Sequence, residues 1–244
     1  MTNKVLLCVT LKTDLWPDWF MAFNNIRLFG KGYSTEVMQI YDFRADEARN
    51  RAFWSFKEQK QYDHLLFLDS DVIIPEDTIP RLLAQRKDIV GGLYVLKAFP
   101  FPPTMYEWHQ KPDANGENFL YRIILDYKRG EMKPCDALAT GCMMVSRKVL
   151  ELPSPWFSFK EGGTEDTYFC RKAQKNGFEI WCDTSVECDH LRVTGVSVGD
   201  YWGAMDKMGG MDAMKKALYK EWLQRPWLKE DKGADEGEFG ETAA

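Results

Sequence analysis

A short apolar run that ends in two carboxylates dictates much of how this chain can fold. Leu65-Leu66-Phe67-Leu68 is followed directly by Asp69-Ser70-Asp71. A continuous apolar run of this length is typical of a strand that is covered on both faces, as in a parallel sheet. A second run of this kind, Val5–Leu11, lies near the N-terminus. We therefore expect two central, parallel strands.

Helical patterns alternate with these strands. In the segment from Asp46 to Gln59, apolar residues recur at helical spacing, which predicts a helix between the two strands. Further helices are predicted over 75–85 and 165–175, and further strands over 88–94, 119–126, 137–146 and 179–181. The proline- and aromatic-rich segment 97–118 predicts a long irregular loop. This alternation indicates an α/β fold with a central, mostly parallel sheet flanked by helices.

The C-terminal part of the chain predicts one more helix and a tail. Met211, Met214, Leu218 and Trp222 form an apolar stripe at helical spacing, and Pro226 is expected to stop that helix. We expect a domain over 1–204, a C-terminal helix over 205–228 that packs on it, and a flexible, disordered acidic tail over 229–244.

Composition narrows the class of protein. The 244 residues suffice for one well-buried core, and a formal net charge of −5 argues against a surface that binds nucleic acid throughout. The six cysteines form no CxxC pair, so we expect reduced thiols and neither a structural zinc site nor a redox motif. Val5–Leu11 is too short for a transmembrane segment or a signal peptide, which predicts a soluble, cytoplasmic protein.

The carboxylates after Leu68 are the first candidate site. They follow the C-terminal end of a predicted strand, where open α/β sheets bind ligands. Asp69 and Asp71 are separated by one residue and can point to the same side, and Mg²⁺ and Mn²⁺ prefer oxygen ligands. The alternative is structural, because acidic residues are common at strand ends as turn formers and helix caps.

Two further groups could complete such a site. After the Gly162-Gly163 pair, Glu165 and Asp166 lie at a predicted helix start, where a carboxylate could accept a proton from a hydroxyl group. Acids in a first helical turn also stabilise the helix, which is the competing explanation. His190 is a possible ligand for a manganese-like ion, although a lone histidine is more often structural.

Taken in order, these motifs resemble the inverting nucleotide-sugar transferases of the GT-A (Rossmann-like) fold, especially family-2-like members. The resemblance implies that Asp69-Ser70-Asp71 is the Asp-x-Asp element, with Asp71 on the metal and Asp69 near the donor ribose and the metal. It implies that Asp166 of the Glu-Asp element is the catalytic base, with Glu165 beside the donor. His190 would complete a metal set of Asp69, Asp71 and His190.

The same resemblance implies further contacts with the donor. Ala48-Arg49-Asn50-Arg51-Ala52 is similar to a helix segment beside the nucleotide, so Arg49 and Asn50 become donor-binding candidates. Thr10, at the end of the first strand, would lie near the nucleobase of the donor, and Gly141 would leave room beside the donor sugar. Solvated helix charges in the Ala48–Ala52 segment, and close packing for Gly141, are the competing explanations.

The implied activity is metal-dependent transfer, with inversion, of a sugar from a nucleotide-diphosphate donor such as a UDP-sugar. The cofactor would be Mn²⁺ or Mg²⁺. The acceptor hydroxyl could belong to a glycan, a small molecule, a protein or a modified nucleic-acid base, and Trp108 and Trp156 could form a stacking platform. Two alternatives stay open: a nucleotidyltransferase, which the lack of a Gly-rich basic phosphate loop disfavours, and a catalytically silent carbohydrate-binding or assembly module.

Overall fold

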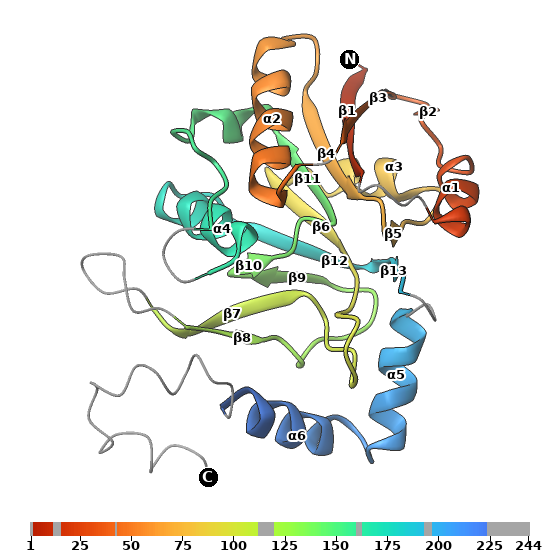
Figure 1. The fold of residues 1–244 in the computed structure, drawn as a ribbon. Coiled ribbons are helices and arrows are strands. Elements are labelled where there is room, and N and C mark those ends of the chain that lie inside the picture. Colours follow the sequence, from red (N-terminus) through yellow and green to blue (C-terminus); the bar gives the residue numbers. More distant parts are fainter. Residues whose placement is uncertain are drawn as a thin grey trace. The chain divides into compact units, whose positions relative to one another are not determined.

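The computed structural model describes residues 2–11, 16–41, 43–111, 120–159, 163–192 and 197–223. The chain divides into two compact units, residues 1–201 and residues 202–244, which are described separately. The first unit contains all of the strands described below and the helices up to the start of α5 (Figure 1).

A large central sheet forms the framework of the first unit. In the described part of the chain, eight strands follow the order β2-β3-β1-β4-β11-β6-β12-β9. β1, β3, β4, β6 and β12 run in one direction, and β2, β9 and β11 run in the other. Their bounds are β1 Asn3–Leu11, β2 Phe29–Gly30, β3 Tyr33–Tyr41, β4 His64–Asp69, β6 Ile89–Leu93, β9 Met132–Cys135, β11 Cys142–Ser146 and β12 Ile180–Glu187. The predicted, mostly parallel α/β sheet is confirmed.

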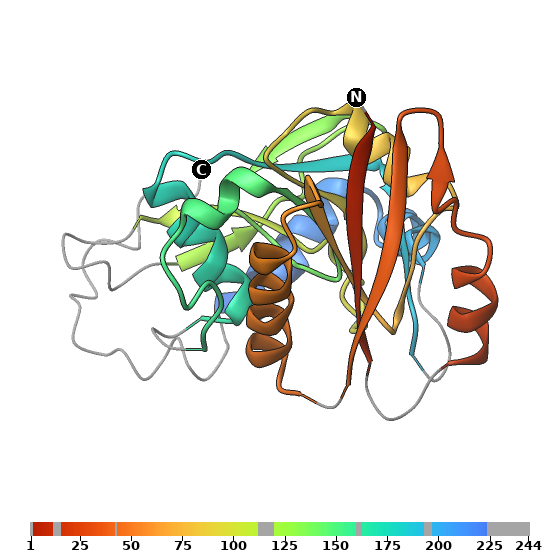
Figure 2. The same cartoon turned by 90° about the horizontal axis from the view of Figure 1, so that it is seen from above.

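Helices cover both faces of this sheet. Phe67 of β4 stacks on Phe53 of α2 (Ala45–Glu58). Its neighbours Leu66 and Leu68 belong instead to the apolar cluster that includes residues of α3 (Thr78–Ala84). Successive strand residues point to opposite faces, so this division places α2 and α3 on the two sides of β4 (Figure 1). Figure 2 shows α2, in orange, lying along the strands. The double cover explains why the run in β4 is apolar at every position.

Helix α4 (Glu165–Lys175) has the predicted bounds, and its two ends explain them. The Thr164 side chain accepts a hydrogen bond from the Thr167 amide and so caps the N-terminus. Gly177, two residues beyond the helix, has a φ of +84°, a conformation that favours glycine. In α3, which begins at Thr78, Pro80 falls in the first turn and breaks no helical hydrogen bond.

The segment predicted as a single strand over 137–146 is divided in the structure. β10 (Ala137–Leu138) joins a separate sheet of order β10-β7-β8, with β7 Met105–Gln110 and β8 Leu120–Ile123. β11 lies antiparallel between β4 and β6 in the central sheet. The prediction of an irregular loop over 97–118 is therefore wrong for β7, which pairs with strands on both sides. The short strands β5 (Val72–Ile73) and β13 (Asp189–His190) pair antiparallel with each other next to the end of β4.

The remaining helices are α1 (Pro17–Phe23), the 3₁₀ helix η1 (Arg147–Glu151), α5 (Val198–Lys207) and α6 (Met211–Leu223). In α6, Met214 and Leu218 are buried, in agreement with the predicted apolar stripe. The expected stop at Pro226 and the expected tail over 229–244 lie outside the described residues. The packing of this helix on the domain stays a prediction. Among the helices that the structure describes, none is long and apolar enough to cross a membrane.

The cysteines are core residues. All six are buried and free. Burial raises the pKa of the Cys8 thiol to about 12. At neutral pH the Cys8 thiol is therefore uncharged and packs as a small apolar side chain.

Candidate active site

A cleft of about 220 Å³ lies at the C-terminal ends of β1 and β4. One part of its wall is apolar and includes Leu11, Ile40 and the half-exposed ring of Phe43. The other part carries carboxylates. Six predicted site residues line the cleft: Thr10, Arg49, Asp69, Asp71, Glu165 and Asp166. Residues from four separate segments thus meet where parallel strands end, the usual ligand position in open α/β sheets.

Asp69 is held in place by protein donors. The parallel register pairs Thr10 directly with Asp69, and the Thr10 hydroxyl donates a 2.6 Å hydrogen bond to its Oδ1. Both terminal nitrogens of Arg49 donate to the two Asp69 oxygens at 3.1 Å. The Trp19 indole N–H donates to the main-chain carbonyl of Asp69. Both carboxylate oxygens of Asp69 therefore already accept hydrogen bonds from protein donors.

Arg49 is the buried centre of the cleft. Its side chain is only 4% exposed, and its Nε lies 3.6 Å from Glu165 Oε1 and 3.6 Å from Asp166 Oδ1. One guanidinium therefore joins the carboxylate at the end of β4 to the two carboxylates at the start of α4. The competing explanation of Arg49 as a solvated helix charge is wrong.

The two acids of α4 have raised pKa values. Burial, followed by the nearby charge of Asp166, raises the pKa of Glu165 to about 7. Burial likewise raises the pKa of Asp166, against the opposing effect of Arg49. The Thr140 hydroxyl donates a hydrogen bond to Asp166 Oδ1 and orients this carboxylate. A fixed carboxylate with a raised pKa is a better proton acceptor than an ordinary surface aspartate.

Asp71 and His190 are brought together by the β5–β13 pair. The register places His190 opposite Val72, and His190 Nε2 lies 3.7 Å from Asp71 Oδ2. His190 Nδ1 lies 2.7 Å from the Val95 carbonyl oxygen, which can only accept, so Nδ1 carries a hydrogen. Nε2 is therefore the ring nitrogen that faces Asp71, an arrangement typical of metal-binding histidines.

A lysine also reaches this pair. Lys97 Nζ donates a 2.6 Å hydrogen bond to Asp71 Oδ2. Although burial opposes it, the neighbouring His190 and Lys97 hold the pKa of Asp71 well below its usual range. Among the described residues, no group of three or more His, Cys, Asp or Glu side chains could hold a metal ion. The described structure therefore does not bring the predicted metal ligands Asp69, Asp71 and His190 together as one such group.

Asn50 does not line the cleft. Its Nδ2 donates to the carbonyl oxygens of Asp46 and Phe157 at 2.8 Å, and its Oδ1 accepts from the amides of Trp156 and Phe157. The amide therefore fastens the 156–157 segment to α2. Trp156 is 1% exposed and packs on Phe53, so the prediction that it forms a stacking platform is wrong.

Gly141 also lies outside the cleft lining. A Cβ at this position would come within 2.6 Å of the Tyr94 hydroxyl oxygen, and the Gly141 amide donates to that oxygen at 3.0 Å. Close packing against Tyr94 thus accounts for this glycine. A contact between Gly141 and the donor sugar stays a prediction.

Sequence reasoning did not identify several residues that shape the cleft. Trp19 Nε1 donates to the carbonyls of Asp69 and Val72 at 3.1 and 3.0 Å and so braces the turn between β4 and β5. Tyr94, Lys97 and Thr140 were also missed. Thr140 is the direct neighbour of Gly141, which the resemblance had singled out, and this adjacency is a usable signal. Nothing in the local sequence distinguishes Lys97 or Tyr94.

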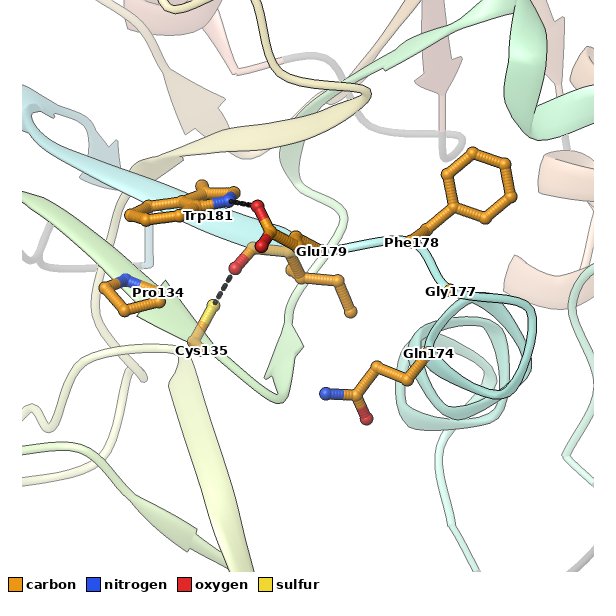
Figure 3. Close-up of a pocket in the computed structure, with 8 residues that line it drawn as sticks. Pro134, Cys135, Gln174, Gly177, Phe178, Glu179 and Trp181 are labelled. Atoms are coloured by element: carbon orange, nitrogen blue, oxygen red, sulfur yellow. Dashed lines mark hydrogen bonds between the residues drawn. The ribbon is translucent and has the colours of Figure 1, made fainter.

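A second hollow, of about 330 Å³, lies at the N-terminal end of β12 (Figure 3). Its carboxylate, Glu179, is engaged by the Trp181 indole at 3.0 Å and by Lys87 at 3.4 Å. The Cys135 thiol is directed at the Ile180 carbonyl. The wall is formed by Pro134, Cys135, Gln174, Gly177, Phe178, Glu179, Ile180 and Trp181. This hollow is larger but lacks a pair of groups suited to catalysis, so chemistry rather than volume identifies the acidic cleft as the candidate active site.

Comparison with known proteins places the fold. No protein-family model matches the sequence, and no curated protein matches it. Among solved structures, the chain is similar to A197 from STIV, with a TM-score of 0.56 and 19% identity over 82% of this chain and 92% of that one.

It is also similar to GalNAc-T7, solved with UDP, GalNAc and Mn²⁺, with a TM-score of 0.52 and 13% identity over 84% of this chain. The match spans 48% of the GalNAc-T7 chain, about half of its length. At these identities the likeness concerns the fold alone. The chain therefore has a GT-A-like α/β fold.

Proposed function

We propose that this protein is a metal-dependent, inverting glycosyltransferase that moves a sugar from a nucleotide-diphosphate donor to an acceptor hydroxyl. The observation that carries the proposal is the position of Arg49. Its buried guanidinium contacts Asp69 of the Asp-x-Asp element and Asp166 of the Glu-Asp element. Two motifs separated by almost a hundred residues thus form one cleft, at the ligand-binding edge of a GT-A-like sheet.

The donor set of Asp71 and His190 fits Mn²⁺ or Mg²⁺, since it offers a carboxylate oxygen and an imidazole nitrogen whose orientation the Val95 carbonyl fixes. When bound, such an ion neutralises negative charge on the leaving diphosphate. GalNAc-T7, a fold relative, has been solved with UDP and Mn²⁺. This supports a UDP-sugar and manganese as the first donor and metal to test.

Asp166 is the proposed base. It would accept the proton of the acceptor hydroxyl while the oxygen forms a bond to the anomeric carbon. The bond from that carbon to the diphosphate oxygen would break on the opposite face, so the sugar leaves with inverted configuration. General-base catalysis of this kind contributes about 10²- to 10⁴-fold. The family-2-like assignment is part of this proposal.

The remaining candidates have supporting roles in this proposal. Thr10 and Arg49 orient Asp69 toward the donor ribose, and Glu165 shares the charge of Arg49 with Asp166. Asn50 acts by fastening the 156–157 segment to the helix that carries Arg49. Gly141 lets Tyr94 approach the end of β4.

The test is a screen of nucleotide sugars with Mn²⁺ for binding and for slow hydrolysis. The wild type is compared with Asp71→Ala and Asp166→Asn. We expect a metal-dependent donor that Asp71→Ala no longer binds and that Asp166→Asn binds but does not turn over. Donor binding without turnover by the wild type would favour the silent module, and pyrophosphate release from a nucleoside triphosphate would favour nucleotidyl transfer. Binding of no donor would refute the proposal.

A further inference from the structure

Lys97 occupies an unusual position in the candidate active site. Its Nζ contacts Asp71 Oδ2 at 2.6 Å, and the same oxygen lies 3.7 Å from His190 Nε2. The Lys97 ammonium thus donates to the same Asp71 oxygen that faces the His190 imidazole. Any cation held jointly by Asp71 and His190 would need this oxygen.

The main chain around Lys97 is held by the segment that carries His190. Arg192 Nη1 donates to the Lys97 carbonyl at 3.2 Å, and the Arg192 guanidinium lies 5.1 Å from the centre of the Phe101 ring. The His190 ring is held by its contact with the carbonyl oxygen of Val95, two residues before Lys97 in the chain. The Lys97 backbone is therefore anchored, whereas its side chain, 35% exposed at the edge of the cleft, has four rotatable bonds.

We propose that Lys97 is a displaceable counter-ion that couples metal binding to donor binding. A divalent ion that arrives alone must remove the ammonium from Asp71. A nucleoside diphosphate supplies anionic oxygens for the ion and a new anionic partner for the ammonium. Metal and nucleotide therefore bind together more favourably than either binds alone. This inference rests on the proposed function, since it assumes a metal at Asp71.

The distribution of charges in the cleft agrees with a separate role for Lys97. Asp69, Glu165 and Asp166 all share Arg49, whereas Asp71 has Lys97 as its own cation. Removal of the lysine charge leaves Asp71 without this partner and leaves Arg49 unaffected. The effect of a Lys97 variant should thus be confined to the Asp71 position.

The test measures Mn²⁺ binding in the absence of nucleotide, from the loss of the free aqueous Mn²⁺ signal in electron paramagnetic resonance. We expect Lys97→Met to bind Mn²⁺ roughly fivefold more tightly than the wild type, or better, since a partly exposed ion pair no longer competes. In saturating Mn²⁺, the same variant should bind UDP more weakly. Addition of UDP should consequently strengthen Mn²⁺ binding less in the variant than in the wild type.

Three further proteins make the result decisive. Lys148→Met, which removes an exposed lysine near Asp88 outside the cleft, should behave as the wild type. Lys97→Gln repeats the test should Lys97→Met fold poorly. Asp71→Asn should lose Mn²⁺ binding. If it does while Lys97→Met and the wild type bind Mn²⁺ equally, the metal site stands and the role of Lys97 is refuted. Undiminished Mn²⁺ binding by Asp71→Asn would overturn the metal site and the inference together.

Discussion

At the scale of single residues, the candidate site depends on how one cation is shared among several acids. Glu165 faces Arg49 at 3.6 Å, with Asp166 and Asp69 as the other charged groups around it. Its pKa of about 7 in the folded protein lies above the 4.5 of an ordinary glutamate. A carboxyl whose pKa is raised by folding destabilises the folded state at every pH above its unfolded pKa.

The raised pKa of Glu165 predicts that Glu165→Gln increases the unfolding free energy in a pH-dependent way. Below about pH 4.5, Glu165 is protonated in both the folded and the unfolded state and has no effect on stability. Between pH 4.5 and 7 its ionisation increasingly lowers the unfolding free energy, and above pH 7 this loss is complete. Relative to the wild type, the variant should gain up to about 3 kcal/mol of unfolding free energy between pH 4.5 and pH 8. Guanidinium unfolding at these pH values measures the difference, with Glu107→Gln as a surface control. An equal effect at both pH values would contradict the predicted raised pKa.

Thr140 gives a second prediction at this scale. Its hydroxyl bond to Asp166 Oδ1 stabilises the charged carboxylate and lowers the pKa of Asp166. Thr140→Val removes the hydroxyl at nearly constant volume, so this pKa should rise further. The ascending limb of the kcat profile should move to higher pH by about one unit, with little loss on its plateau. Thr184→Val, a buried Thr→Val change whose hydroxyl meets only main-chain carbonyls, is the matched control and should leave the limb in place.

The sequence singled out Asp69, Asp71 and Asp166 as candidates because their types and local spacing carry a chemical signal. It did not show which residues each of them contacts. Arg49 reaches Asp69 across 20 residues, and Lys97 reaches Asp71 across 26. Such contacts depend on how segments cross in space, which no local pattern records. The roles that we assign to these residues remain proposals for experiment.

At the scale of elements, the turn between β4 and β5 sets the direction of both Asp-x-Asp carboxylates. The Trp19 indole of α1 donates to two carbonyls of this turn, Asp69 and Val72. The Ser70 amide donates to the Thr10 carbonyl at 3.1 Å, and the Leu191 amide donates to the Asp71 carbonyl at 2.7 Å. The turn is therefore held by α1, by β1 and by the residue that follows β13.

Trp19→Phe tests this bracing. The ring can still pack on Phe23, whereas the donor of two carbonyl hydrogen bonds is lost. We expect a loss of about 1–3 kcal/mol of unfolding free energy, because buried carbonyls lose a partner. Mn²⁺ binding should also weaken, because Asp71 would be less well fixed. Trp54→Phe changes a tryptophan that is 46% exposed and should affect neither quantity. Weaker stability with unchanged Mn²⁺ affinity would limit Trp19 to a structural role.

Elements with strong local signals were the ones that sequence could predict. α4 has its cap at Thr164 and its left-handed glycine at Gly177, and both ends matched. β7 was hidden by the prolines around it, and β3 was missed because its exposed, mixed residues show no apolar run. The direction of β11 depends on its neighbours β4 and β6, which its own residues do not reveal.

At the scale of the whole first unit, the residue patterns predict the α/β class with a mostly parallel sheet, whereas the GT-A-like form was implied by the resemblance of the Asp-x-Asp and Glu-Asp elements. Continuous apolar runs require strands that are covered on both faces, and helices between them require parallel connections. These constraints survive when sequence identity with fold relatives falls to 19% or below. The acceptor of the proposed reaction does not follow from these patterns, because binding residues commonly lie on loops whose sequences vary.

Ligand binding should stabilise the whole first unit, because its cleft takes residues from β1, α2, β4 and α4. With Mn²⁺ and UDP at a hundred times the dissociation constant, the expected gain is about 2.7 kcal/mol. For a unit of this size, that corresponds to a rise in Tm of roughly 5–10 °C. Differential scanning calorimetry would measure the shift, which excess EDTA should reverse. Asp71→Asn should show none, and Asp166→Asn should keep it in full, because the proposed base acts on the acceptor rather than holding the donor. Loss of the shift in Asp166→Asn would instead place Asp166 among the donor-binding groups and remove it as the base.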